Sequence, residues 1–200
     1  MSLPTDPSRG SKQTLLGREE VAVWCVEDGP QITDSLLARY ERLLNDDERS
    51  RYERYRADRA KRQFLIGRAL VRTTLSRYEP SVSPEQWWFE ANEYGRPEIA
   101  PGLIATALRF NLSHTDGFAA CAVAWENDIG VDVEFVARRT GGVHLARRFF
   151  SASEVDDLLR LPAEQQRDAF FDYWTLKEAY IKARGMGLAI PLGHFSFHLR

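Results

Sequence analysis

The spacing of apolar residues changes along the chain, and this change limits the possible folds more than any other feature of the sequence. From Asp34 to Tyr78, apolar side chains recur three or four residues apart, as in Leu36 and Tyr40, which is the spacing of a helix with one buried face. One helix is predicted to begin near Asp34, which can cap it. A second helical stretch is predicted over about 46–78, broken once.

The middle of the chain has the pattern of short strands. Three strand-like runs, 110–114, 118–125 and 129–136, follow one another with short connections between them. The short connections predict antiparallel pairing of the last two runs. A strand is also predicted to begin at Trp87, before a turn at 92–97 that contains glycine and proline.

Helical signals return in the last third of the chain. Ser151 and Glu154 have the spacing of a capping box, which predicts a helix that begins there. Pro162 stands near the start of a further helix that is predicted to end at Gly185. Alternating apolar residues over 195–199 then predict a final strand.

This order of helices and strands predicts an α+β protein with two halves of similar size. We divide the chain into a flexible N-terminal tail, 1–18, an N-terminal half, 19–108, and a C-terminal half, 109–200. Because the sequence stops directly after a predicted strand, without a closing element, we expect the C-terminal half either to lack its last strands or to close differently.

The charged residues are nearly balanced, which argues against some classes of partner. The chain has 27 basic and 29 acidic side chains and a formal net charge of -2, so we expect no nucleic acid partner and no attraction to a membrane surface. No run of about 18 apolar residues and no apolar leader occur, so we expect no membrane span and a cytoplasmic location. Cys25 and Cys121 lack metal-ligand spacing and are interpreted as reduced thiols.

Two carboxylates form the first candidate site. Asp132 and Glu134 are two residues apart in a predicted strand, so their side chains share one face. Paired carboxylates repel each other unless a cation lies between them. Oxygen ligands of this kind suit Mg²⁺, which often shares its coordination shell with substrate phosphates. The alternative is a polar strand face with two solvated acids.

A second candidate site lies on the predicted helix that ends at Gly185. Trp174, Glu178 and Lys182 are spaced four residues apart and share a face, with Lys177 beside them. Glu178 could complete a site of three carboxylates, and Lys182 could contact a phosphate as a point charge. The alternative is an ordinary amphipathic helix in which Glu178 and Lys182 form a surface pair.

Two further polar motifs could contact a phosphate or a nucleotide. Ser113 and His114 stand at the end of an apolar strand and could bind a phosphate through hydroxyl and imidazole. Adjacent strand residues point to opposite faces, which argues against a nucleophile and its base. Gly95 lets the backbone come close to a ligand beside Arg96 and Pro97. The alternatives are a strand-end turn and an ordinary tight turn.

The four motifs, taken in order, resemble the Sfp-type 4′-phosphopantetheinyl transferases. The family pattern runs GKP or GRP, FNxSH, GxDxE and WxxKEAxxK. In this chain the motifs are Gly95-Arg96-Pro97, Phe110-Asn111-Leu112-Ser113-His114, Gly130-Val131-Asp132-Val133-Glu134 and Trp174 through Lys182. The resemblance covers about residues 35–199, and its Lys-Glu-Ala ending resembles the subgroup linked to polyketide, glycolipid and general carrier proteins.

The resemblance implies a pseudo-twofold monomer of two α+β halves, with coenzyme A bound in the cleft between them. It implies Mg²⁺ ligands at Asp132, Glu134 and Glu178. The implied contacts to coenzyme A are Lys182 and His114 at the phosphates with Ser113 beside them, Gly95, Arg96 and Pro97 at the adenine and ribose-phosphate end, and Arg62 and Arg51 at the nucleotide phosphates. The chain departs from the family at Glu48, where a basic residue is usual.

The implied reaction is attack by a serine hydroxyl of an acyl or peptidyl carrier protein on the β-phosphate of coenzyme A, with 3′,5′-ADP as the leaving group. Glu178 is the candidate base, directly or through a metal-bound water, and Asp132 and Lys182 are the other catalytic candidates. A basic segment could dock an acidic carrier protein or could simply be solvated; it contains Arg138, Arg139, Arg147 and Arg148.

Two other classes of function stay open at this point. One is a module of the same fold that binds coenzyme A or a carrier protein without turnover. The other is a Mg²⁺-dependent phosphohydrolase, which would release ADP from coenzyme A without any acceptor.

Overall fold

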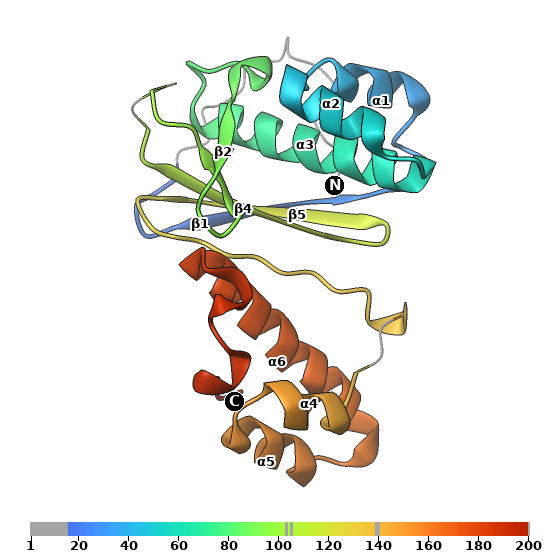
Figure 1. Ribbon diagram of the computed structural model, residues 1–200, viewed down its shortest axis with the longest axis vertical. Helices are drawn as coiled ribbons and strands as arrows, with labels where there is room; N and C mark the ends of the chain where they lie inside the picture. The colour runs from blue at the N-terminus through green and yellow to red at the C-terminus, as the bar shows by residue number, and fades with distance from the viewer. Residues whose placement is uncertain (1–15, 103, 105, 139–140, 200) are drawn as a thin grey trace.

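A computed structural model describes residues 16–102, 104, 106–138 and 141–199 of the chain (Figure 1). The predicted tail, 1–18, therefore lies almost entirely outside the described residues. The described part contains both helices and antiparallel strands, so the predicted α+β class is confirmed. No helix in it is long and apolar enough to cross a membrane.

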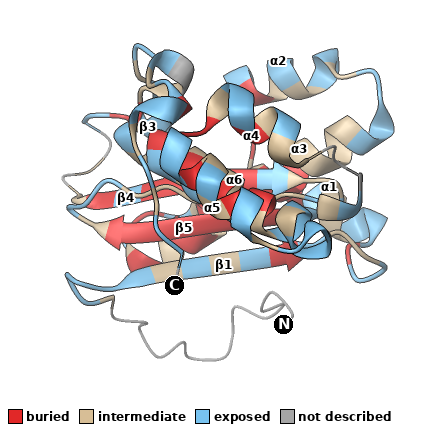
Figure 2. Ribbon diagram, turned by 90° about the horizontal axis from the view of Figure 1, so that it is seen from below, coloured by how far each residue is buried: buried red, intermediate tan, exposed pale blue. Residues whose placement is uncertain are grey.

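The strands form a three-stranded antiparallel sheet and a separate hairpin. The sheet has the order β1 (Val21–Glu27), β5 (Phe118–Trp125) and β4 (Leu108–Thr115). β5 is buried along most of its length, whereas β1 at the edge is largely exposed (Figure 2). The hairpin consists of β2 (Phe89–Ala91) and β3 (Pro97–Ile99), and the predicted turn joins its two strands.

Three helices lie on one side of the sheet, in the order that the apolar spacing predicts; the last of them packs on the sheet and the first two pack on the last. They are α1 (Asp34–Glu41), α2 (Asp46–Arg54) and α3 (Asp58–Tyr78), and the predicted break lies between the last two (Figure 1). The cap of α1 is Thr33, whose hydroxyl accepts a hydrogen bond from the backbone of Leu36, rather than Asp34. The core beneath these helices includes Leu65, Leu70 and Leu75.

Three more helices lie on the other side of the sheet: α4 (Val143–Phe149), α5 (Ala152–Arg160) and α6 (Ala163–Arg184) (Figure 1). The predicted capping box at the start of α5 is present, because the side chains and backbones of Ser151 and Glu154 bond each other. α6 ends as predicted at Gly185, whose φ of 67° is the left-handed conformation that favours glycine. The C-terminal end of α6 approaches the sheet (Figure 1).

The predicted strand over 129–136 is wrong, and so is its pairing with β5. β5 pairs with β1 on one side and β4 on the other, so no edge of β5 is free for a third partner. The segment 129–135 instead crosses between the sheet and α6 (Figure 1). Its backbone N–H groups bond alternate side chains of β4: Val131 to Asn111, Val133 to Ser113 and Phe135 to Thr115, at 3.0, 3.3 and 3.1 Å. In this segment, side chains of β4 therefore accept the hydrogen bonds that backbone carbonyls of a neighbouring strand would accept in a sheet.

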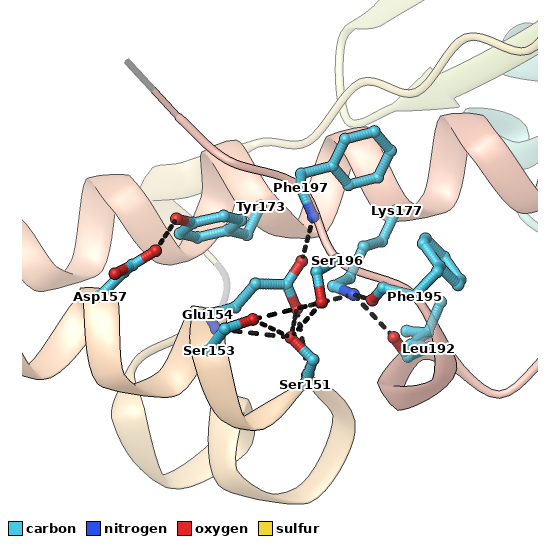
Figure 3. A network of polar contacts seen from close by, with 10 residues as sticks. All are labelled: Ser151, Ser153, Glu154, Asp157, Tyr173, Lys177, Leu192, Phe195, Ser196 and Phe197. Atoms are coloured by element: carbon cyan, nitrogen blue, oxygen red, sulfur yellow. Dashed lines mark hydrogen bonds and ion pairs between the residues drawn. The ribbon is translucent and has the colours of Figure 1, made fainter.

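The predicted strand over 195–199 is also wrong. The carbonyl of Phe195 accepts from the Lys177 ammonium, and the N–H of Phe197 donates to the Glu154 carboxylate (Figure 3). A buried ion pair thus uses the backbone groups that a strand ladder would need. The described strands all lie within residues 21–125, and the predicted boundary between halves, after residue 108, falls inside β4.

Glu48, where the sequence departs from the family pattern, is buried against two arginines of α3. Its carboxylate lies 2.5 Å from Arg72 Nη2 and 3.5 Å from Arg68 Nε. Arg72 has no solvent exposure, and its other terminal nitrogen donates to the carbonyls of Pro84 and Trp87. Glu48 therefore neutralises a charge that would otherwise be buried unpaired.

We expect Glu48→Ala to lower the free energy of unfolding by about 3 kcal/mol, because it leaves the Arg72 guanidinium buried without its counterion. Urea denaturation followed by circular dichroism measures the change. Glu41→Ala is the matched control, because Glu41 pairs with Arg49 at 3.3 Å in a far more exposed position. The control should cost less than about 1 kcal/mol. Equal losses in the two variants would contradict the assignment.

Candidate functional site

Three sequence motifs meet around the carboxylate of Asp132. Its Oδ1 accepts a hydrogen bond from Lys182 Nζ of α6 at 2.6 Å and another from Ser113 Oγ of β4 at 3.0 Å. Lys182 Nζ also lies 2.9 Å from Ser113 Oγ and 3.3 Å from the carbonyl of Val131. The structure therefore brings together the β4 motif, the segment after β5 and the end of α6, which are far apart in sequence.

The second oxygen of the same carboxylate has no such partner. Asp132 Oδ2 is buried and makes no hydrogen bond, although the Asp132 side chain is only 6% exposed. A buried carboxylate oxygen without a donor is costly. This oxygen lacks a positive partner, so Asp132 is a candidate ligand for a small hard cation.

Glu134 and Glu178 also face the contact between the segment 129–135 and α6. Glu134 Oε1 accepts a hydrogen bond from the indole of Trp174 at 3.1 Å. Since Glu134 meets Trp174 and Asp132 meets Lys182, the segment runs along the helix face that carries both contacts. Glu178 lies one turn from each of them, so it belongs to this face as well.

The three predicted metal ligands do not form a ready-made cluster. Among the described residues, no three His, Cys, Asp or Glu side chains converge closely enough to hold a metal ion. The assignment of Asp132, Glu134 and Glu178 as ligands therefore stays a prediction. Asp132 and Glu134 can lie on one face of the chain without being part of a strand. Every second residue of this segment bonds β4, and the residues between them, Asp132 and Glu134, contact α6.

Gly130 explains how the segment comes so close to α6. A Cβ atom at this position would lie 1.8 Å from the carbonyl oxygen of Ala179 and 2.7 Å from the backbone nitrogen of Ala183. Both neighbours are backbone atoms of α6, which cannot move aside independently. Only glycine permits this approach, and the approach places Asp132 within reach of Lys182.

We expect Gly130→Ala to lower the free energy of unfolding by about 1–3 kcal/mol, because the added methyl group forces the segment away from α6. Chemical denaturation measures the loss. Gly193→Ala is the control: its Cβ would lie 3.5 Å from the nearest atom, the carbonyl oxygen of Phe150, which is an ordinary contact. If Gly130→Ala proved as stable as Gly193→Ala, the close approach would not exist in solution.

His114 lies in a basic environment at the end of β4. Burial lowers the pKa of its imidazole below the ordinary value, and the positive charges of Lys182, Arg68 and Arg51 lower it further, against a bond to its own backbone. Arg51 also lines a pocket of about 460 Å³ together with Arg54 and Tyr55. His114 thus lies within the electrostatic influence of several cations, which could attract an anion.

Arg68 belongs to this environment and was missed by the sequence analysis. Its side chain is 15% exposed, and its guanidinium stacks over the Phe64 ring at 5.3 Å. The long helix contains several arginines, and their spacing alone does not separate one near β4 from those in solvent. The signal that could have found it is Glu48, because a buried acid on α2 requires a basic partner on the helix packed against it.

We expect the His114 imidazole to titrate below its ordinary pKa of 6.5 in NMR spectra of the folded protein. Its neutral form is favoured in the folded state, so its contribution to stability is present above the unfolded pKa and is lost as the pH falls through the folded one. Arg68→Gln should move the His114 pKa up towards 6.5, since it removes a neighbouring positive charge. A downward movement would show that Arg68 does not face His114.

Arg96 links the hairpin to the site rather than standing free. Its side chain is 8% exposed, and its Nη1 donates to the Ala183 carbonyl at 2.7 Å and lies 3.4 Å from Asp128. Gly95 has a φ of 86° in the hairpin turn, and Pro97 begins β3. Arg96 thereby ties the turn to the C-terminal end of α6. Its predicted contact to coenzyme A, like those of Gly95 and Pro97, stays a prediction.

Arg62 is likewise held by the protein. Its Nε donates to Asp28 at 2.7 Å, and its Nη2 donates to the carbonyl of Ile32 at 2.7 Å. The predicted contact of Arg62 with nucleotide phosphates stays untested. In the basic segment, Arg147 and Arg148 are exposed at the end of α4, while the side chains of Arg138 and Arg139 lie outside the described part of the structure.

Lys177 does not share the face of Lys182, which corrects the sequence interpretation of this helix. Its ammonium has no solvent exposure and lies 2.7 Å from Glu154 Oε2 (Figure 3). It also donates to the carbonyls of Leu192 and Phe195, each at 2.7 Å. Lys177 therefore holds α5, α6 and the C-terminal segment together and leaves the site to Lys182.

Comparison with known proteins places both parts of the chain in one family. Residues 31–126 match the family described as 4′-phosphopantetheinyl transferase, N-terminal. Residues 128–200 match the 4′-phosphopantetheinyl transferase superfamily. These two ranges contain every motif that the sequence analysis identified.

Individual relatives agree with this placement. The chain is 38% identical over 177 residues to the 4′-phosphopantetheinyl transferase HetI of Nostoc sp., covering 88% of the chain and 73% of that protein. It is 33% identical over 161 residues to the 4′-phosphopantetheinyl transferase Sfp of Bacillus subtilis, covering 80% of the chain and 69% of that protein. Among solved structures, a holo-(acyl-carrier-protein) synthase from Bacillus anthracis in complex with CoA (3′,5′-ADP) is a remote match. It has 19% sequence identity and a TM-score of 0.43, and the match covers 52% of this chain and 91% of that chain.

Proposed function

Because this chain belongs to the 4′-phosphopantetheinyl transferase superfamily, we propose that it transfers the 4′-phosphopantetheine group of coenzyme A to a serine of an acyl or peptidyl carrier protein. The observation that carries the proposal is the cluster of Asp132, Ser113 and Lys182, in which three family motifs converge. A binding module without turnover would not need this combination of acid, hydroxyl and ammonium.

The reaction exchanges one oxygen for another on phosphorus. The serine Oγ forms a bond to the β-phosphorus of coenzyme A, and the bond from that phosphorus to the bridging oxygen breaks. The bridging oxygen leaves with the electron pair as part of 3′,5′-ADP. Negative charge grows on the leaving oxygen, so positive groups near the pyrophosphate stabilise the transition state.

The residues around Asp132 fit a Mg²⁺ ion. Asp132 Oδ2 is a buried oxygen without a partner, and Glu134 and Glu178 add carboxylates on the same contact between segment and helix. We propose that these three side chains hold the ion. When bound, Mg²⁺ supplies positive charge to the pyrophosphate oxygens.

The basic side chains would bind the substrate. Lys182 contacts Ser113, and His114 is the next residue of β4, so both side chains lie near the end of this strand. Arg51 and Arg68 add positive charge on the His114 side. This arrangement would orient the β-phosphorus towards the incoming serine.

Glu178 is the proposed general base. It is partly buried and lies one turn before Lys182 on α6, and its carboxylate would accept the proton of the serine hydroxyl. A carboxylate in this position also stabilises the positive charges around it. Removal of its charge should therefore slow the transfer more than it weakens substrate binding.

We expect Glu178→Gln to lower the rate of transfer by about 10²–10⁴-fold while the protein stays folded, because the amide keeps the shape but accepts no proton. Intact-mass spectrometry of a panel of apo carrier proteins, incubated with enzyme, coenzyme A and Mg²⁺, measures the transfer. Glu164→Gln, on an exposed position of the same helix, is the control and should keep full activity.

The same experiment separates the alternatives. Release of ADP from coenzyme A without an acceptor would indicate a phosphohydrolase. Binding of coenzyme A without a mass gain on any carrier protein would indicate a non-catalytic module. Full activity of Glu178→Gln would leave the transferase intact and remove Glu178 as its base.

A further inference from the structure

The ammonium group of Lys182 has no hydrogen left to offer a substrate. It carries three N–H donors, and three acceptors surround it: Asp132 Oδ1 at 2.6 Å, Ser113 Oγ at 2.9 Å and the Val131 carbonyl at 3.3 Å. A lysine bound in this way serves the protein itself. It cannot contact a phosphate through a direct N–H bond until at least one of these contacts is broken.

The hydroxyl of Ser113 completes this closed set of contacts. It donates its one hydrogen to Asp132 Oδ1 and accepts from Lys182 Nζ and from the backbone N–H of Val133. Both its donor and its two acceptor positions are therefore used. The one polar atom of this group that makes no bond is Asp132 Oδ2.

We propose that Lys182 occupies the place of a divalent cation at Asp132, and that a divalent ion binding there releases the ammonium to contact the phosphates of coenzyme A. The inference rests on the proposed function, since it takes Asp132 as a ligand of Mg²⁺. It adds that metal and lysine compete for one carboxylate. Lys182 is thus both a placeholder in the protein and a substrate contact in the loaded site.

Electrostatics supports an exchange rather than joint occupancy. A divalent ion on the carboxylate of Asp132 would lie within a few ångströms of the Lys182 ammonium, and the two positive charges repel strongly in a site that is mostly shielded from water. Asp132 is 6% exposed but Lys182 is 29% exposed, so the lysine has the open path outward. Its long flexible stem allows the ammonium to move without moving α6.

The exchange would couple the two ligands of the enzyme. Without the ion, Asp132 holds Lys182, and the phosphates lack one cationic contact. With the ion bound, the released ammonium becomes available to the same phosphates. By reciprocity, an ion that strengthens the binding of coenzyme A must itself bind more tightly when coenzyme A is present.

Reactivity of individual lysines tests the release. An amine-reactive ester is applied at fixed pH with and without Mg²⁺, in the absence of coenzyme A, and each lysine is followed by peptide mass spectrometry. We expect labelling of Lys182 to rise severalfold with Mg²⁺, while Lys61 on α3, which lies over the Tyr52 ring, stays unchanged. Lys177, without solvent exposure, should remain unlabelled in both conditions.

Two variants make the test specific. Asp132→Asn should leave Lys182 highly reactive with or without Mg²⁺, because the anionic partner is gone. Lys182→Met should tighten the binding of Mn²⁺, measured by electron paramagnetic resonance, by severalfold, because the competing cation is gone. The second variant keeps the test decisive if the first does not fold.

The outcomes separate this inference from the proposed function. If Mn²⁺ binds and Mg²⁺ supports transfer but the labelling of Lys182 does not change, the exchange is overturned and the transferase stands. Weaker Mn²⁺ binding by Lys182→Met would overturn it as well. If no divalent ion binds even with coenzyme A present, the proposed role of Mg²⁺ fails and the exchange fails with it.

Discussion

The contact between α6 and the segment 129–135 is the constraint on which the proposed active site depends. Gly130 lets the segment contact the backbone of the helix. Two residues later, Asp132 Oδ1 lies 2.6 Å from Lys182 Nζ. The same segment is bonded to β4, because the backbone N–H of Val133 donates to the Ser113 hydroxyl. The sheet and the helices are therefore joined at the site itself. A shift of either unit would separate the carboxylate from its lysine.

Two ion pairs, one buried and one partly buried, fix the rotation of α6 about its own axis. Lys177 is held on the rear of the helix by Glu154, and Lys182 is held on the front by Asp132. Five residues correspond to about 140° around the helix axis, so these two lysines serve opposite sides. The pair of Lys177 and Glu154 is fully buried and also bonds backbone groups of the C-terminal segment, which suits a structural role. The pair of Lys182 and Asp132 is partly exposed to solvent and can exchange partners.

Sequence reasoning was most successful where structure depends on local chemistry. The helices α1 to α3, the break between α2 and α3, the capping box of α5 and the stop at Gly185 all follow from residue spacing within one or two turns. It failed for 129–136 and 195–199, where the pattern suggests a strand but does not reveal whether a partner strand is available; Val136 even begins a 3-10 helix. A strand needs a free neighbouring edge, and here side chains of β4 and the pair of Glu154 and Lys177 take that place.

The sequence by itself determined the family and named the residues of the proposed site, because four motifs in fixed order leave few other interpretations. It also placed Asp132 and Glu134 on one face, since alternation depends only on the local backbone. The tertiary structure alone decided which lysine of α6 reaches Asp132 and that Glu48 is a counterion for Arg72. Charge pairing and burial depend on what packs against a side chain, and residues from distant parts of the chain supply those neighbours.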